Sequence, residues 1–162
     1  MSQTIQITQQ IQIADKHIEG GYGCGQAVLA AFATRYGLTE KEARRIACCF
    51  GGGVGRSGQV CGAVSGALMV LGLHYWDDDA EVPPHKERIY ALSAEFMDRF
   101  AALHGTTQCR ELLGANLRDP VQLEKAKEDG LFSTLCPGYI HDAIQLVEEF
   151  IHEHDQPEHQ EE

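Results

Sequence analysis

A glycine-rich segment, residues 51–58, places the strongest constraint on how this chain can fold. Five of its eight residues are glycine, which loses more conformational freedom than any other residue when it is fixed in a helix or strand. Regular structure is therefore expected to end before the segment and to begin again after it. The residues on both sides have helical patterns, so the segment predicts a tight connector between two helices.

Capping signals define the helices around this connector. An alanine-rich stretch over residues 24–36 predicts one helix, and Gly37 is a natural stop for it. Thr39 and Glu42 have the spacing of a capping box, which predicts the start of the helix that runs up to the connector. Residues 59–75 predict the helix that follows, and one of its faces carries small residues, namely Gly62, Ser65, Gly66 and Ala67.

Four other segments have the apolar spacing of amphipathic helices. Three of them span residues 9–19, 85–103 and 121–128, and the fourth starts near Pro137, a residue suited to the first turn of a helix. Residues 5–13 alternate partly, as a strand would, but the pattern continues into a helical one. A strand is therefore the weaker interpretation there.

Length and composition favour one globular domain. The chain has 162 residues, and a hydrophobic content of 43% can fill a core without disulfides or metals. We expect an all-α, single-domain bundle of about six or seven helices over residues 1–155, followed by an acidic, disordered tail over residues 156–162. A cofactor in such a domain would serve function more than folding.

Charge and hydropathy exclude several classes of partner. The chain has 24 acidic and 13 basic residues, and its net charge of -11 disfavours both nucleic acid and an anionic membrane surface. No apolar run reaches the roughly 18 residues of a membrane span, and the first residues lack a signal-peptide pattern. We therefore expect a cytoplasmic protein, in which six cysteines serve as metal ligands, catalytic groups or buried residues rather than structural disulfides.

Four of the cysteines lie at predicted breaks between helices. Cys24 follows a glycine cluster, Cys61 follows the glycine connector, Cys109 follows a helix stop, and Cys136 precedes Pro137. Helix starts gather at the ends of a bundle, so these four thiols can converge at one end. We place Cys61 in the first turn of its helix, where the partial positive charge and free N–H groups favour the thiolate that binds metals and attacks disulfides.

The four cysteines allow three interpretations. They suit a four-thiolate metal or iron–sulfur centre, and they suit two redox pairs equally well. The third interpretation is that they are small apolar core residues, as most free cysteines are. No spacing among them forms a CxxC ligand pair. One or both of the adjacent Cys48 and Cys49 are expected to be buried packing residues, with a supporting role for Cys49 left open.

The glycine connector has a binding interpretation as well. Residues 53–58 match GxGxxG formally, but they follow a helix instead of a strand and lack the lysine of a P-loop. A connector whose N–H groups cap the next helix is the simpler interpretation, and phosphate binding is a lesser one. The functional alternative is that loop N–H groups and Arg56 surround an anionic centre at Cys61, with the candidate binding residues Gly53, Gly55, Arg56, Gly58 and Gly62.

Small residues predict close packing between two of the helices. The helix after the connector carries Gly62 and Gly66, and the helix over residues 24–36 is rich in alanine. If these helices run nearly parallel, their close approach brings Cys24 and Cys61 together. The same faces are compatible with a homodimer and equally with an all-α monomer.

Several segments together resemble the C_GCAxxG_C_C family, a group of bacterial and archaeal redox-active proteins with four characteristic cysteines. The resemblance covers roughly residues 14–149 and rests on the motifs at residues 23–29, 50–58, 61–66, 109–114 and 131–137.

The resemblance implies a redox role and a set of ligands. A related domain in split-Soret cytochromes is associated with an iron–sulfur centre, which implies that Cys24, Cys61, Cys109 and Cys136 ligate a cluster here. The chain has no CxxCH motif, so covalent c-type haem is not expected. Cys48 and Cys49 lie outside the four-cysteine pattern.

The sequence thus supports one leading function and two alternatives. The leading hypothesis is an iron–sulfur protein, with [2Fe–2S] as the candidate cluster, that transfers electrons to or from a protein partner or senses redox state. The first alternative is a metal-free thiol–disulfide oxidoreductase with Cys61 as its nucleophile. The second is a non-enzymatic protein that binds zinc through the same ligands.

Overall fold

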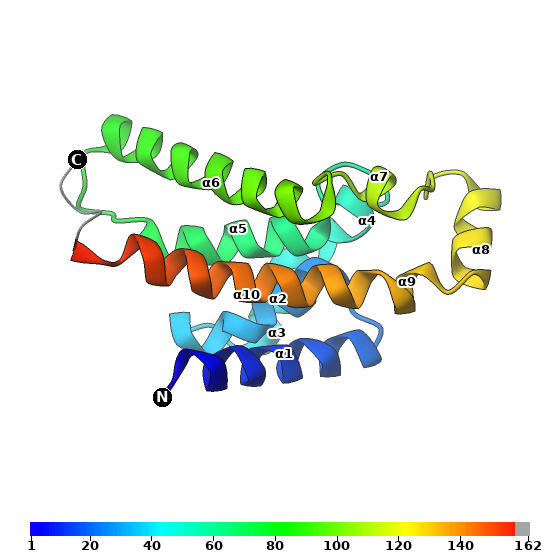
Figure 1. The fold of residues 1–162 in the computed structure, drawn as a ribbon, viewed down its shortest axis with the longest axis horizontal. Coiled ribbons are helices and arrows are strands. Elements are labelled where there is room, and N and C mark those ends of the chain that lie inside the picture. The colour runs from blue at the N-terminus through cyan, green and yellow to red at the C-terminus, as the bar shows by residue number, and fades with distance from the viewer. Residues whose placement is uncertain (158–162) are drawn as a thin grey trace.

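The computed structural model describes residues 1–157 and forms an all-α bundle (Figure 1). Seven helices in this part of the chain have eight residues or more, in agreement with the predicted six or seven. The tail predicted over residues 156–162 lies almost entirely outside the described residues. The seven long helices are α1 (Gln3–Glu19), α2 (Cys24–Phe32), α3 (Glu40–Ala47), α5 (Gly62–Tyr75), α6 (Val82–His104), α8 (Pro120–Glu128) and α10 (Cys136–His154).

Five shorter segments connect these helices. Two are 3₁₀ segments, η1 (Ala33–Tyr36) after α2 and η2 (Cys48–Phe50) after α3. The other three are α4 (Gly51–Val54), α7 (Cys109–Leu113) and α9 (Leu131–Thr134). Most of them lie at the end of the bundle where α10 begins (Figure 1).

The predicted capping residues are in place. The Thr39 hydroxyl accepts a hydrogen bond from the Glu42 N–H at 3.1 Å, and the Glu42 carboxylate accepts from the Thr39 N–H at 2.8 Å. Gly37 ends the α2–η1 segment in the left-handed conformation, with φ of 75°. Pro137 occupies the first turn of α10, as predicted.

Two predicted boundaries differ from the structure. Helix α1 begins at Gln3 instead of residue 9, because the Ser2 hydroxyl caps it by accepting a hydrogen bond from the Ile5 N–H. The alternation over residues 5–13 is therefore part of a helix. The helix predicted over residues 59–75 begins later, at Gly62, and Cys61 is its N-cap instead of a first-turn residue.

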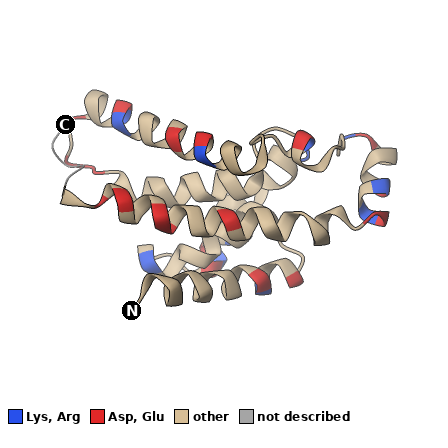
Figure 2. Ribbon diagram, viewed as in Figure 1, with Lys and Arg blue, Asp and Glu red and all other residues tan. Residues whose placement is uncertain are grey.

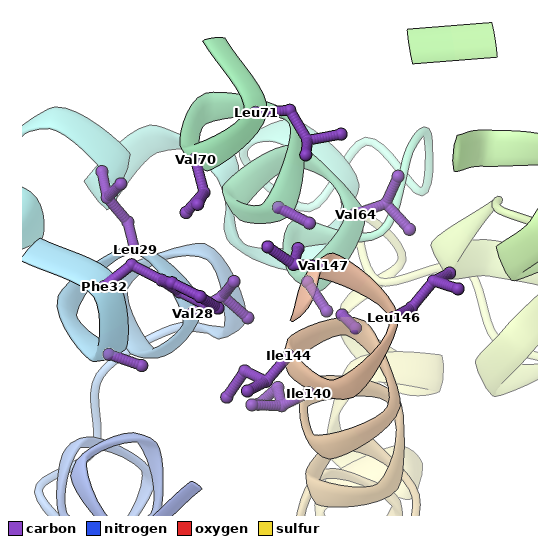
Figure 3. Packing of buried hydrophobic residues seen from close by; sticks show 14 of the residues in the cluster. Val28, Leu29, Phe32, Val64, Val70, Leu71, Ile140, Ile144, Leu146 and Val147 are labelled. Atoms are coloured by element: carbon purple, nitrogen blue, oxygen red, sulfur yellow. The ribbon is translucent and has the colours of Figure 1, made fainter. Parts of the chain in front are cut away.

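The core lies between α2, α5 and α10. Figure 3 shows side chains from these three helices pointing into a shared interior. The predicted apolar stripe on α10 (Ile140, Ile144, Val147 and Ile151) is buried, with no member more than 4% exposed. This burial fixes the first turn of α10 against the first turns of α2 and α5, and therefore positions the residues that begin those helices.

Glycines allow α2 and α5 to approach closely at these first turns. A Cβ atom added to Gly62 would lie 3.0 Å from the Gly25 nitrogen and 3.1 Å from the Cys24 Cβ. One added to Gly66 would lie 2.9 Å from the Gly25 oxygen. The predicted close approach of the two helices is confirmed, and it brings the backbone of Cys24 next to α5.

A buried carboxylate connects the N-terminal helices to α10. Glu148 is 4% exposed and accepts a hydrogen bond from Gln10 of α1 at 2.6 Å and from Arg35 of η1 at 2.7 Å. A buried charge is tolerated only when it is paired and hydrogen-bonded, and both conditions are met here. Glu148 thus joins α1, η1 and α10 at one point.

The outer faces of the helices carry most of the charge, with acidic positions spread along α1, α6 and α10 (Figure 2). Among residues 1–157, no helix combines the length and the apolar character needed to cross a membrane.

Candidate cysteine centre

The glycine connector forms a left-handed turn. Five successive residues, 52–56, have φ between 56° and 66°, although Val54 and Arg56 are not glycine. A left-handed conformation costs roughly 1–2 kcal/mol for each residue with a side chain, and it is rare for a β-branched one. Such strain persists only where the surrounding structure imposes it, and it is concentrated at functional sites.

The turn is tied together by its own backbone. The N–H groups of Arg56 and Gly58 donate to the carbonyls of Gly51 and Gly52, and the Gly55 N–H donates to the Cys49 carbonyl. Gly53 has no room for a side chain, since a Cβ there would lie 2.5 Å from the Gln59 nitrogen and 2.8 Å from the Cys109 Cβ. The glycines therefore allow the chain to fold back tightly against Cys109.

A short antiparallel pairing positions Cys61 and Cys109. Val60 and Gln108 form an isolated β-bridge. The Cys61 N–H donates to the Thr107 carbonyl at 2.8 Å, and the Cys109 N–H donates to the Gln59 carbonyl at 2.7 Å. These two cysteines, 48 positions apart in sequence, are thus fixed to one another through the backbone.

The four cysteines at helix starts converge on one small cavity. Cys24, Cys109 and Cys136 are the first residues of α2, α7 and α10, and Cys61 is the N-cap of α5. All four line the same cavity of about 40 Å³. A cavity of this size holds roughly three water molecules, which is too little for an organic cofactor.

The four thiols lie at two depths. Cys61 and Cys109 are buried, with exposures of 4% and 7%, whereas Cys24 and Cys136 are only partly buried. Cys24 and Cys136 also line a larger groove that opens beside the cavity. The centre therefore has an inner pair of cysteines and an outer pair that faces the groove.

Burial overrides the expected effect of the helix N-terminus on Cys61. Desolvation raises the pKa of Cys61 to about 12, and the nearby Cys24 adds to the shift, although hydrogen bonds from the N–H groups of Ala63 and Val64 lower it. The pKa of Cys109 is also raised to about 12, first by desolvation and then by Cys61 and Cys24. The N–H groups at the helix start thus favour the thiolate as expected, but the burial of Cys61 has the larger effect on its pKa.

Cys24 follows the same trend for a different main reason. Its pKa is raised well above the ordinary value, first by a hydrogen-bonding interaction with the Cys136 thiol and then by burial. Without a positive charge in the cavity, the protein thus favours neutral thiols. A bound metal supplies such a charge and deprotonates the thiols that coordinate it.

Residues other than the four cysteines complete the wall of the cavity. Leu112, Leu113, Phe132 and Tyr139 line it, together with Gly52 and Gly62. The Tyr139 hydroxyl donates to the Leu112 carbonyl at 3.1 Å and so joins α10 to α7. Of these residues, only Tyr139 lies outside the motifs noted in the sequence, and only its proximity in space shows that it helps to enclose the site.

The glycine connector contributes to the centre mainly through its shape. Gly62, one of the predicted binding residues, lines the cavity, and Gly53 contacts Cys109. The N–H groups of Gly55, Arg56 and Gly58 make hydrogen bonds within the turn. Direct contact of Gly53, Gly55, Arg56 and Gly58 with a bound group therefore stays a prediction.

The prediction for Cys48 and Cys49 is wrong, because both residues are exposed. They lie on η2, with their sulfur atoms 3.8 Å apart. The 3₁₀ geometry of η2 ends the packed face of α3 at Ala47, so both thiols point to solvent instead of the core. Neither lines the four-cysteine cavity.

The cavity contains sulfur ligands alone. No histidine or carboxylate from the described part of the chain lines it. Soft thiolate ligands favour iron–sulfur clusters, zinc and copper(I) over hard cations. Among residues 1–157, no three or more His, Cys, Asp or Glu side chains are close enough to hold a single metal ion. A cluster distributes its ligands over several irons, so its ligands can lie further apart than those of one zinc ion.

Comparison with known proteins gives one match. The model of the C_GCAxxG_C_C family, described as "Putative redox-active protein", matches residues 22–150. The matched region contains all four cysteines of the centre, the glycine connector and Cys48–Cys49. The searches of curated proteins and of solved structures found no match.

Proposed function

Because the chain belongs to the C_GCAxxG_C_C family of redox-active proteins, we propose that Cys24, Cys61, Cys109 and Cys136 ligate an iron–sulfur cluster. The main support for this proposal is that the four cysteines, from four separate helix starts, line one small cavity. Among the described residues, no histidine or carboxylate joins them there. A compact cluster such as [2Fe–2S] is the candidate. Such a cluster would supply one-electron chemistry.

The surroundings fit an electron-transfer or redox-sensing role. Apolar side chains cover the inner pair of cysteines and limit access of water, which tunes the potential of a cluster. The outer pair lies nearer to solvent, where a protein that donates or accepts electrons can approach. The electron partner is thus expected at the face that carries Cys24 and Cys136.

A metal-free thiol–disulfide oxidoreductase is the second candidate. The interaction between the Cys24 and Cys136 thiols favours it, since neighbouring thiols can be oxidised to a disulfide. The exposed Cys48–Cys49 pair is a further place for such chemistry. The buried Cys61 fits the role of attacking nucleophile poorly, because a nucleophile must be both accessible and ionised.

Anaerobic purification separates these functions. We expect a brown protein that contains iron and acid-labile sulfide, with visible charge-transfer absorption. A colourless protein that loses two free thiols on mild oxidation would support the thiol–disulfide function, and stoichiometric zinc would support the zinc-binding one. Failure to take up iron and sulfide under anaerobic reconstitution would overturn the proposal.

Single substitutions test the four ligands. Replacing Cys24, Cys61, Cys109 or Cys136 with serine is expected to remove most of the bound iron. The matched controls Cys48→Ser and Cys49→Ser should retain it, because these residues lie outside the cavity. Circular dichroism of each variant shows whether lost iron reflects a lost ligand or a lost fold.

A further inference from the structure

We infer that the groove beside the cysteine centre binds a small organic anion with an apolar body. The groove has a volume of about 590 Å³, within the usual range for small-molecule sites. It shares Cys24, Gly52, Phe132 and Cys136 with the wall of the cysteine cavity. A molecule in the groove would therefore contact the outer pair of cysteines directly.

The charged residues of the groove favour binding of an anion. Among residues 1–157, the groove is lined by two cations, Arg56 and Lys127, and by no carboxylate, although the chain as a whole carries a net charge of -11. Within residues 1–157, neither cationic side chain has a hydrogen bond or ion pair. Lys127 lies on α8, whose basic positions are visible at the right-hand end of Figure 2. Two unpaired cations in an acidic protein form a local anion site.

The backbone holds Arg56 at this place at some energetic cost. Arg56 has φ of 64°, and its Cγ would lie 2.9 Å from a Cβ at Gly52. The side chain thus packs over Gly52, one of the four residues that line both the groove and the cysteine cavity. A strained residue that presents an unpaired charge to a cavity is typical of a ligand site.

The other groove residues favour an apolar body on the ligand. The groove is also lined by large apolar and aromatic side chains, namely Ile18, Tyr22, Leu117, Phe132 and Ile140. A bare inorganic anion would leave this surface in contact with water, whereas an aromatic or branched carboxylate covers it. The ligand class is therefore an anionic organic molecule instead of free phosphate.

Binding of such an anion is independent of the cluster. Only the further claim that the ligand reacts at the centre rests on the proposed function. Binding is therefore measured by ligand-observed NMR at millimolar concentration, on the protein as purified and with its iron content determined separately. A protein that takes up no iron and sulfide on anaerobic reconstitution but binds the anion would overturn the proposed function and support the inference. A protein that takes up both but does not bind the anion would overturn the inference and leave the proposed function in place.

Three probes and two sets of variants define the test. Benzoate is the anionic probe, benzamide is its neutral analogue of nearly the same shape, and inorganic phosphate is an anion without an apolar body. We expect benzoate to bind most tightly. Arg56→Gln combined with Lys127→Gln should weaken benzoate binding about tenfold and leave benzamide binding unchanged.

The control variant is Lys125→Gln, which removes a charge from the same helix but not from the groove. It should bind benzoate like the unmodified protein. Equal binding of benzoate and benzamide, undiminished benzoate binding by the double variant, or no binding of benzoate would overturn the inference. Phosphate binding as tight as that of benzoate would overturn the apolar part of the ligand class.

Discussion

At Cys61, the desolvation of a buried sulfur outweighs two N–H groups that favour its ionisation. Cys48 and Cys49 have the opposite environment, because both are exposed. The pKa of Cys49 is raised by its hydrogen bond with the Cys48 thiol, but solvent still reaches both sulfur atoms. The reactivity of a thiol depends on its ionised fraction and its access, so the two groups of cysteines should be chemically distinct.

Alkylation of the metal-free protein tests this difference. With a pKa of about 12, roughly one Cys61 thiol in ten thousand is ionised at pH 8. Brief treatment with iodoacetamide should therefore modify Cys48 and Cys49 and leave Cys61 and Cys109 intact, as read by mass spectrometry of peptides. The rate at Cys61 should rise about tenfold per pH unit between pH 7 and 11. A plateau at Cys61 below pH 9 would contradict the assignment.

The close packing of α2 against α5 depends on Gly66, because the space beside it has no room for a larger side chain. A Cβ at Gly66 would lie 2.9 Å from the Gly25 oxygen and 3.0 Å from the Val28 Cβ. Gly66→Ala should therefore lower the free energy of unfolding by about 1–3 kcal/mol, even though alanine favours the helical state. Urea denaturation measures the change.

Gly72 provides the matched control on the same helix. Nothing lies within 4 Å of a Cβ at this position, so Gly72→Ala should stabilise the protein by about 0.5–1 kcal/mol. If both substitutions changed stability by the same amount and sign, close approach would not be the cause. Gly66→Ala should also reduce bound iron, because it separates the first turns that carry Cys24 and Cys61.

Two substitutions in the left-handed turn, Gly53→Ala and Gly55→Ala, test how tightly the turn folds back on the chain. Gly53 and Gly55 both have positive φ, so alanine at either position should cost about 1 kcal/mol. A Cβ at Gly53 also meets the backbone of Gln59, whereas nothing lies within 4 Å at Gly55. Gly53→Ala should therefore be more destabilising than Gly55→Ala by at least about 1 kcal/mol in thermal denaturation. Equal effects would mean that the fold-back against Gln59 is not tight.

Sequence patterns predicted the helices and their ends better than the conformation of the glycine connector. Thr39, Gly37 and Pro137 have a local mechanism that a sequence displays, and each caps or ends a helix as expected. The left-handed turn was not predictable, because Val54 and Arg56 disfavour it and tertiary packing imposes it. The pairing of Val60 with Gln108 was missed for a related reason: a single bridge has no periodicity.

The same division applies to the site. The sequence predicted that each of the four cysteines lies at a helix start and that the four converge. It could not predict their pKa shifts, since these depend on how deeply α7 and α10 bury Cys61. Exposure of Cys48 and Cys49 depends on the change from α-helix to 3₁₀ geometry after Ala47, which no residue signals.

On the scale of the whole molecule, Glu148 is a buried polar residue that connects the N-terminal helices to the last one. Arg35→Ala should leave its buried carboxylate with one partner fewer and lower the free energy of unfolding by about 1–3 kcal/mol. The control Arg45→Ala removes an exposed arginine and should change stability by less than about 0.5 kcal/mol. A similar effect of both substitutions would show that the Glu148 contact is not stabilising.

The order in which the chain is made sets a limit on how the centre is filled. Cys136 emerges from the ribosome more than a hundred residues after Cys24, and it reaches the other three sulfurs only when its helix docks. A nascent chain thus cannot assemble the complete ligand set. If the four cysteines hold a cluster as proposed, its atoms would have to enter after synthesis, into an already folded protein, from the side where Cys24 and Cys136 face the groove.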